Sequence, residues 1–296
     1  MKLTTWIAAL LVSTSAAAFA QNMGPRDVDA LPASAPTLIV AYGKDPLQTG
    51  ELRLPAGKGP FPVVIVIHGG CWTKGFATKK NTAPLASALT ALGYATWNIE
   101  YRQIGDPGAG WPGTFQDWAA AADYLRILAK TQPISLKHVA VIGHSAGAHA
   151  ALWLASRSKL PASSEIASKD PLQIDTAIAI DGPGELTPFV GFDAEVCGKP
   201  VIAPLIGGTP AEQPKRYDEA SPISALPVAA REFLIASSVL TPEAAEHYIS
   251  VASSKGQSVQ LLKVKEGGHF DIIAPNSKAW AEQVEPFVTN ALRTSK

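Results

Sequence analysis

The chain has 296 residues, of which 47% are hydrophobic and 17% are charged, and this supplies core material for one large α/β domain or two small ones. The composition excludes intrinsic disorder as the general state of the chain. The 25 basic and 25 acidic residues give a formal net charge of zero. No run of like charges occurs, so we expect no nucleic-acid partner.

The first twenty residues have the pattern of a secretory signal peptide. Lys2 supplies a positive charge, residues 6–12 form a short apolar run, and Ala18-Phe19-Ala20 has the small-x-small form of a cleavage site. The run is shorter than the roughly 20 apolar residues that a membrane-spanning helix needs. We therefore expect residues 1–20 to be a signal peptide and the protein to be exported, periplasmic or secreted, with no membrane partner.

Residues 21–36 are rich in Pro, Ala, Asp and Ser, and this composition predicts a flexible leader. From residue 37 to residue 296 the chain alternates predicted strands with predicted helices, without an internal repeat or a low-complexity linker. We expect this part of the chain to form one domain.

Eight apolar segments of that domain are predicted as strands. Phe61–Ile67 is a continuous, mostly β-branched run, which is typical of a strand buried on both faces of a sheet. The full set is 38–42, 51–54, 61–67, 94–99, 139–142, 177–180, 233–236 and 259–264.

Helices are predicted between and after these strands, at 115–129, 146–156, 242–253 and 278–292. Strands separated by helices indicate an α/β fold, with a mostly parallel eight-stranded sheet and helices on both faces. Segment 183–222 is rich in Gly and Pro and has no long regular element. We expect it to cross the carboxyl ends of the strands, where ligands bind in open α/β sheets.

Gly143-His144-Ser145-Ala146-Gly147 lies between a predicted strand and an Ala-rich helix, which is the context that a G-x-S-x-G nucleophile elbow requires. The glycines allow a sharp turn beneath Ser145, and the helix places its positive end near the oxygen where negative charge would develop. The alternative is an ordinary serine at a strand–helix turn. The context predicts Ser145 as a nucleophile.

A serine hydroxyl needs a base within about 2.6–3.2 Å to react at neutral pH. In this arrangement the histidine comes late in the chain, and of the six histidines only His247 and His269 follow Ser145 at a suitable distance. His247 falls inside a predicted helix, which indicates a surface residue, whereas His269 lies in a glycine-containing loop after the last strand. We predict His269 as the base, and His144 and His149 as packing or hydrogen-bonding groups.

His68-Gly69-Gly70-Cys71-Trp72 follows the 61–67 strand, at the position of an HGG-type oxyanion loop. Adjacent glycines expose backbone N–H groups. Gly70 and Cys71 are therefore predicted to donate to an oxyanion from one side and Ala146 from the other. The alternative is a Gly-rich turn with no further role.

The carboxylate that should orient the histidine is harder to assign. It is expected after the strand that ends at Ala236, but residues 237–242 contain no Asp or Glu. Asp181 follows the 177–180 strand at the same edge of the sheet, and Glu243 begins the next helix, where it could simply complement the helix dipole. We favour Asp181, with Glu243 or no direct carboxylate as the alternatives. Asp271 is too close to the histidine in sequence to be the usual partner.

Cys71 and Cys197 are the two cysteines. In an oxidising compartment they allow one disulfide bond, and the sequence leaves a bridge and two thiols equally open. No CxxC or HExxH spacing accompanies them, so no metal site is predicted, and no cofactor is implied.

The elbow and the glycine loop, with their surroundings, resemble the α/β-hydrolase superfamily. Within it the chain is similar to the group that contains kynurenine formamidases and feruloyl or acetyl-xylan esterases, over most of residues 38–294. The resemblance implies the α/β-hydrolase fold, with Ser145 as nucleophile and His269 as base. The supporting stretches are Asn98-Ile99-Glu100-Tyr101-Arg102, Gly110–Asp117, Gly207-Gly208-Thr209-Pro210, Ser221-Pro222 and Gly268-His269-Phe270-Asp271.

The chain departs from the family pattern after the seventh strand, where residues 236–241 look shortened and lack the usual Asp. The departure is compatible with a relocated acid, a weak enzyme or a lost activity. Export weighs against a formamidase, because kynurenine metabolism is expected inside the cell.

The favoured function is a serine hydrolase that cleaves a small-molecule carboxylic ester through an acyl-enzyme intermediate. The alternatives are a hydrolase of N-formyl aryl amides and a non-catalytic hydrolase-like binding protein. Trp72, Trp97, Trp111 and Phe189 are candidates for an acyl or aryl pocket near the strand ends, although core packing is the better interpretation of Trp97.

Overall fold

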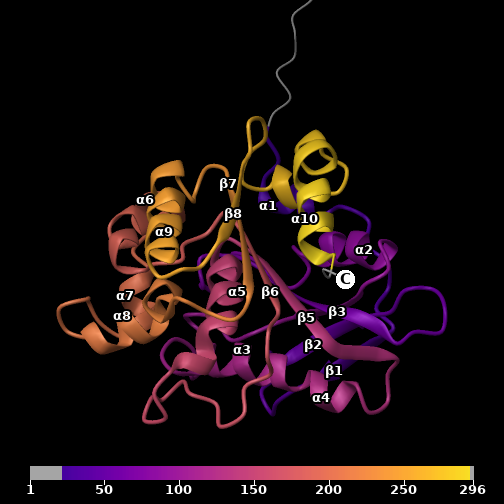
Figure 1. Ribbon diagram of the computed structural model, residues 1–296, viewed down its shortest axis with the longest axis horizontal. Coiled ribbons are helices and arrows are strands. Elements are labelled where there is room, and N and C mark those ends of the chain that lie inside the picture. The colour runs from indigo at the N-terminus through magenta and orange to yellow at the C-terminus, as the bar shows by residue number, and fades with distance from the viewer. Residues whose placement is uncertain (1–21, 294–296) are drawn as a thin grey trace, which may run out of the picture.

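Figure 1 shows the computed structural model of the chain, which describes residues 22–293. Eight strands form a single sheet in the order β1-β2-β4-β3-β5-β6-β7-β8. The β1–β2 and β2–β4 pairs are antiparallel and all other neighbours are parallel, which confirms the predicted mostly parallel sheet. The strands are β1 (Leu38–Ala41), β2 (Thr49–Arg53), β3 (Phe61–Ile67), β4 (Ala95–Ile99), β5 (Ile134–His144), β6 (Thr176–Ile180), β7 (Arg231–Ala236) and β8 (Val259–Lys263).

The central strands are apolar throughout because both faces of the sheet are covered. Alternate side chains of a strand point to opposite faces, so Val63 and Ile65 of β3 join one apolar cluster and Val64 and Val66 join the other. The helices lie on the two sides of the sheet in Figure 1. Helices α3 (Gly113–Asp123), α4 (Leu125–Leu128), α5 (Ala146–Ser156) and α9 (Pro242–Ser254) contribute to the first cluster, and α1 (Pro25–Asp29), α2 (Ala83–Ala91) and α10 (Glu285–Leu292) to the second.

The parallel strands bring the segments with predicted function to one edge of the sheet. Residues 68–72 follow β3, Ser145 follows β5, Asp181 follows β6, and His269 lies in the loop after β8. Segments far apart in the sequence therefore meet where the parallel strands end.

The prediction of a flexible leader over residues 21–36 needs correction. Residues 25–29 form helix α1, and Val28 is fully buried in the cluster formed with α2 and α10. The backbone carbonyl of Ser34 accepts a hydrogen bond from Arg53 Nε at 2.9 Å. The buried side chain of Val28 holds this segment against the domain, although the Pro- and Asp-rich composition of the segment does not indicate a packed helix.

Several element boundaries also differ from the predictions. Strand β5 begins at Ile134, five residues before the predicted start, and the predicted helix 115–129 is divided into α3 and α4. The last helix begins with a π-helical turn over Trp280–Val284, just before Pro286, which has no backbone N–H to donate. Segment 183–222 contains only short helices, α6 (Phe192–Cys197), α7 (Ile202–Ile206) and α8 (Pro214–Ala220), besides two 3₁₀ turns.

Within residues 22–293, no helix combines the length and the apolar character needed to cross a membrane. The predicted signal peptide, residues 1–20, lies outside the described residues.

Candidate active site

Ser145 stands on a sharp turn between β5 and α5. Its backbone has φ 57° and ψ −120°, a conformation that non-glycine residues rarely adopt and that clusters at functional sites. A Cβ atom on Gly143 would collide with the carbonyl of Gly147, and one on Gly147 would collide with the carbonyl of Ile67. The Ser145 N–H donates to the carbonyl of Ile180 at 2.8 Å, which ties the turn to the end of β6. The predicted elbow is therefore present in its backbone geometry.

The His269 ring is held by a buried carboxylate. Its Nδ1 donates to Oδ2 of Asp181 at 2.8 Å, and the Asp181 residue is fully buried, with φ 52°. Because Nδ1 carries the proton in this bond, Nε2 is the ring nitrogen left to accept one when the ring is neutral. The structure thus brings His269 together with Asp181 and not with Glu243, which is exposed in the first turn of α9.

The loop after β7 contains no Asp, but its backbone holds the carboxylate of Asp181. Backbone N–H groups of Ser237, Ser238, Val239 and Leu240 all donate to the Asp181 carboxylate, at 2.8–3.2 Å. Burial alone would raise the pKa of Asp181. The hydrogen bond from His269, the charge of that ring and the backbone donors outweigh it and lower the pKa below its ordinary value. Asp181 is therefore an ionised partner for the imidazole.

His144 fixes the backbone of the histidine loop. Its ring packs on His269 with centroids 4.2 Å apart, and its Nε2 donates to the His269 carbonyl at 2.8 Å. Burial, and then the nearby His269, holds the pKa of His144 well below its usual 6.5. His144 is thus a neutral hydrogen-bonding group.

Ser145 Oγ itself is not hydrogen-bonded to the His269 ring in the part of the chain that the structure describes. The two residues are nevertheless neighbours through His144, which adjoins Ser145 in sequence and packs on His269. Catalytic hydrogen bonds are often long in free enzymes and tighten when substrate binds. The lack of this bond therefore does not exclude Ser145 and His269 as the predicted nucleophile and base.

The oxyanion loop lies directly beside the elbow. A Cβ atom on Gly69 would come within 2.8 Å of Ser145 Cβ. Gly70, Cys71 and Trp72 all have positive φ, at 103°, 53° and 51°. This run of unusual backbone conformations accompanies the close approach of the loop to the serine.

Two polar side chains that follow β4, Glu100 and Tyr101, bond to the oxyanion loop. Tyr101 donates its hydroxyl to the carbonyls of His68 at 3.0 Å and Gly69 at 3.4 Å. His68 Nδ1 donates to the Gly69 carbonyl at 2.8 Å, and its Nε2 bonds to Glu100 at 2.7 Å. These bonds occupy the carbonyls of the loop. Opposite the loop, α5 begins at Ala146, and the first N–H groups of a helix have no partner within it.

Cys71 is bonded to Cys197 in a disulfide that joins the oxyanion loop to α6, with Cα atoms 6.0 Å apart. This settles the cysteine pairing that the sequence left open. The sequence named Cys197 as a possible partner of Cys71, but it did not indicate that the bond would join the oxyanion loop to α6.

Trp97 and Trp72, two of the candidates for a pocket, are buried core residues. His149 is buried, with Nε2 donating to the Ala220 carbonyl at 2.8 Å, and so is the hydrogen-bonding group that was predicted. Burial lowers the pKa of His149 to about 4, which keeps it neutral. His247 on α9 is largely exposed and pairs with Glu185 at 3.4 Å.

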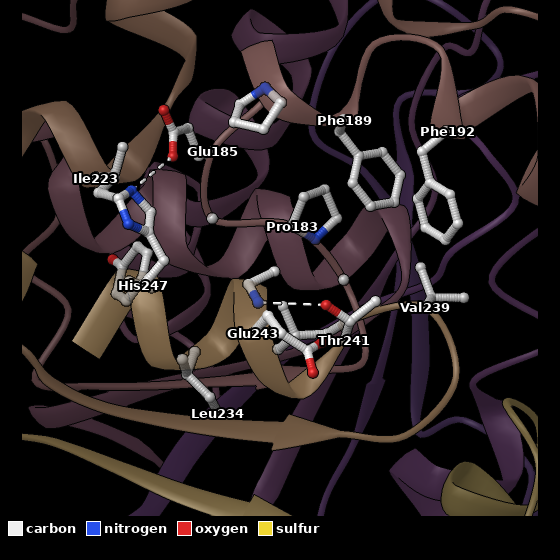
Figure 2. A pocket seen from close by; sticks show the side chains of 16 residues that line it. Pro183, Glu185, Phe189, Phe192, Ile223, Leu234, Val239, Thr241, Glu243 and His247 are labelled. Carbon is white, nitrogen blue, oxygen red and sulfur yellow. Dashed lines mark hydrogen bonds and ion pairs between the residues drawn. The ribbon is translucent and has the colours of Figure 1, made fainter. Parts of the chain in front are cut away.

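A cavity of about 520 Å³ lies between the loop after β6 and helix α9 (Figure 2). Phe189 and Phe192 lie on one side of it near Val239, and the Glu185–His247 pair lies on the other. Gly182, which follows Asp181, also lines it. Of the four aromatic residues predicted for a pocket, Phe189 alone lines this cavity.

Within residues 22–293, no group of three or more His, Cys, Asp or Glu side chains is placed to hold a metal ion.

Solved structures that resemble this one include several esterases. A truncated carbohydrate esterase from gut microbiota superimposes with a TM-score of 0.70 at 21% identity, covering 86% of this chain and 95% of that one. Esterase B from Lactobacillus rhamnosis, inhibited by a tributyrin phosphonate, has a TM-score of 0.71 at 19% identity, covering 90% and 89%. A thermophilic esterase from Thermogutta terrifontis with bound butyrate has a TM-score of 0.65 at 15% identity, covering 86% and 92%. At these identities the likeness shows the fold.

No curated protein matches the sequence. The model of the BD-FAE family matches residues 51–239, a span that runs from β2 past the elbow to the loop that holds Asp181. With the eight-stranded sheet and the esterase neighbours, this match shows that the chain belongs to the BD-FAE family of esterase-type α/β-hydrolases.

Proposed function

We propose that the protein is a serine esterase that hydrolyses small carboxylic esters through an acyl-enzyme intermediate. The observation that carries the proposal is the His269–Asp181 pair, set at the same sheet edge as the Ser145 elbow and the oxyanion loop. Each of these parts supplies a group that acyl transfer needs.

In the first half of the reaction, Ser145 Oγ attacks the ester carbonyl while its proton passes to His269 Nε2. The negative charge on the carbonyl oxygen is stabilised by the N–H groups of Gly70, Cys71 and Ala146. Asp181 stabilises the imidazolium that forms. The ring then gives the proton to the leaving alcohol, and the acyl group remains on Ser145.

In the second half, water attacks the acyl carbonyl and passes a proton to His269. The tetrahedral intermediate collapses, the carboxylic acid leaves, and the ring returns its proton to Ser145 Oγ. Every step uses side chains and backbone groups of this chain.

The non-catalytic alternative rested on the lack of an Asp after the seventh strand. The bond between Asp181 and His269 removes that reason, because the carboxylate is supplied from the end of β6. N-formyl aryl amides would need the same nucleophile and base, and nothing in the site favours them over esters.

The proposal is tested by hydrolysis of p-nitrophenyl acetate and butyrate. Ser145→Ala should lose the activity and should not react with a fluorophosphonate probe, whereas Ser253→Ala, at an exposed serine near the end of α9, should match the wild type. Equal rates for wild type and Ser145→Ala would overturn the proposal. Acetylated sugars belong in the substrate panel, because one structural neighbour is a carbohydrate esterase.

A further inference from the structure

The disulfide bond joins two parts of the site that the sheet does not connect. Cys71 belongs to the oxyanion loop after β3, and Cys197 ends helix α6, 126 residues later in the chain. Both cysteines are buried, with 8% and 6% of their surface exposed. The bond thus spans from the proposed oxyanion donors to the segment that covers the strand ends.

On the oxyanion side, the bond holds a backbone that needs support. Cys71 and Trp72 are consecutive non-glycine residues at positive φ, and such residues keep this conformation only where their surroundings impose it. Thr73 fixes the carbonyl side of the loop, because its Oγ1 donates to the Cys71 carbonyl at 2.8 Å. The disulfide fixes the side chain of the same residue.

On the other side, the bond holds one wall of the cavity. Helix α6 has only six residues and lies between Gly191 and Gly198, which both have positive φ. Its first residue, Phe192, lines the cavity and packs edge-on against Phe189, with ring centroids 5.2 Å apart. A six-residue helix has little stability by itself. The buried Asp193 carboxylate ties α6 to its flanking residues Gly191, Val201 and Ile202, and the disulfide is the link that ties it to the oxyanion loop.

We propose that Cys197 is a positioning residue of the ester site. Its bond to Cys71 keeps the Cys71 N–H aimed at the oxyanion and holds Phe192 against the cavity. Loss of the bond should therefore lower turnover and also weaken the preference among acyl chain lengths. The inference rests on the proposed esterase function.

The test compares wild type with the double variant Cys71→Ser/Cys197→Ser on p-nitrophenyl acetate and p-nitrophenyl hexanoate. The serine at residue 71 retains the backbone N–H. We expect kcat to fall about 10- to 100-fold on both esters, somewhat less than for complete loss of an oxyanion donor. Part of the proposal is that only the longer acyl chain extends from Ser145 to the cavity wall, so we expect KM to rise more for the hexanoate than for the acetate.

Leu128→Ala serves as the control for simple destabilisation. Leu128 is a buried residue of α4, which precedes β5 and so lies at the opposite edge of the sheet. This variant should lower Tm while kcat and KM stay near the wild-type values at temperatures where it is folded. A double cysteine variant that loses only Tm, like this control, would overturn the inference.

A second measurement covers the case in which the double variant does not fold. Folded wild type is treated with a phosphine, which is oxidised to its oxide as the S–S bond becomes two thiols, and the thiols are counted. The same fall in kcat, reversed on reoxidation, is expected. Full activity at two thiols per chain would contradict the inference while leaving the esterase function intact. An inactive wild type would instead reject the function itself.

Discussion

Asp181 combines burial with an unusually complete set of donors. Four backbone N–H groups and the His269 ring share its two carboxylate oxygens. A buried charge is tolerated only when it is compensated in this way. The same bonds fix the direction of the carboxylate toward Nδ1 of the imidazole.

Asp181→Asn should impair the reaction. The amide has one accepting oxygen where the carboxylate has two, so it keeps only part of the backbone hydrogen bonds. It also cannot stabilise the imidazolium or hold its tautomer, so we expect kcat to fall about 10³- to 10⁴-fold. Steady-state hydrolysis of p-nitrophenyl butyrate measures the loss. Glu243→Gln, at the alternative acid, should change kcat by less than about threefold; a large loss there with an active Asp181→Asn would reverse the assignment.

Glu232 makes stability depend on pH. It is buried on β7, where it accepts hydrogen bonds from Tyr248 at 3.1 Å and from Gln257 at 2.8 Å. Burial raises the pKa of Glu232 from 4.5 to about 7, and those two bonds offset only part of the rise. The folded protein therefore binds this proton more tightly than the unfolded chain does. The contribution to stability is complete below about pH 4.5 and is lost as the pH rises to about 7.

Glu232→Gln should consequently raise the free energy of unfolding at pH 8, by up to about 3 kcal/mol, and change it much less at pH 5. Chemical denaturation of both proteins at the two pH values measures the difference. An equal effect at pH 5 and pH 8 would show that the proton of Glu232 is not involved.

At the scale of elements, the sequence predicts the strands that are buried on both faces, because their apolar residues are consecutive in the chain. Strand β3 and the segments Ala177–Ile180 of β6 and Phe233–Ala236 of β7 are continuous apolar runs, because a sheet covered on both faces needs apolar side chains on both. The elbow is predictable because it depends on five consecutive residues. The sequence analysis did not identify helix α2, because its nine Ala-rich residues include no charged side chain that would mark a solvent-facing side.

The sequence reduced the candidates for the carboxylate that pairs with His269 to Asp181 and Glu243, but it could not decide between them. The choice between Asp181 and Glu243 depends on how β6 and β7 pair and on where the loop after β7 aims its N–H groups. Neither the spacing nor the residue types along the chain contain that information. The disulfide was open for the same reason, because its two ends meet only in the folded molecule.

Helix α1 should contribute to stability although its composition suggests a leader. Val28→Ala removes fully buried methyl groups from the cluster with α2 and α10, and we expect a loss of about 1–3 kcal/mol in the free energy of unfolding. Ile39→Ala is the matched control, because Ile39 is 66% exposed and such changes stay within about 0.5 kcal/mol. Equal effects of the two changes would mean that α1 does not pack as described.

At the scale of the whole molecule, we propose that the protein is exported. The disulfide requires an oxidising environment to form and persist, and the first twenty residues have the pattern of an export signal. We therefore expect the exported protein to begin at Gln21. N-terminal sequencing of the protein isolated from the periplasm or the medium measures this, and an N-terminus at Met1 would contradict it.

The segment before α1 also contacts the loop that carries His269. The Met23 N–H and the Gly268 N–H both donate to Asp271 Oδ2, at 3.2 and 2.9 Å. Asp271, excluded as the acid, thus shapes the loop that carries His269 and links it to the segment before α1.

The four backbone hydrogen bonds to Asp181 also determine which substitutions the loop after β7 can accept. The donors are main-chain amides, which every amino acid except proline possesses. Val239 and Leu240 line the cavity with their side chains while their amides hold the acid. Substitutions at these two positions can therefore change the shape of the cavity while the backbone hydrogen bonds to Asp181 remain. If the cavity holds the acyl group as proposed, libraries that omit proline at these positions should change the substrate range.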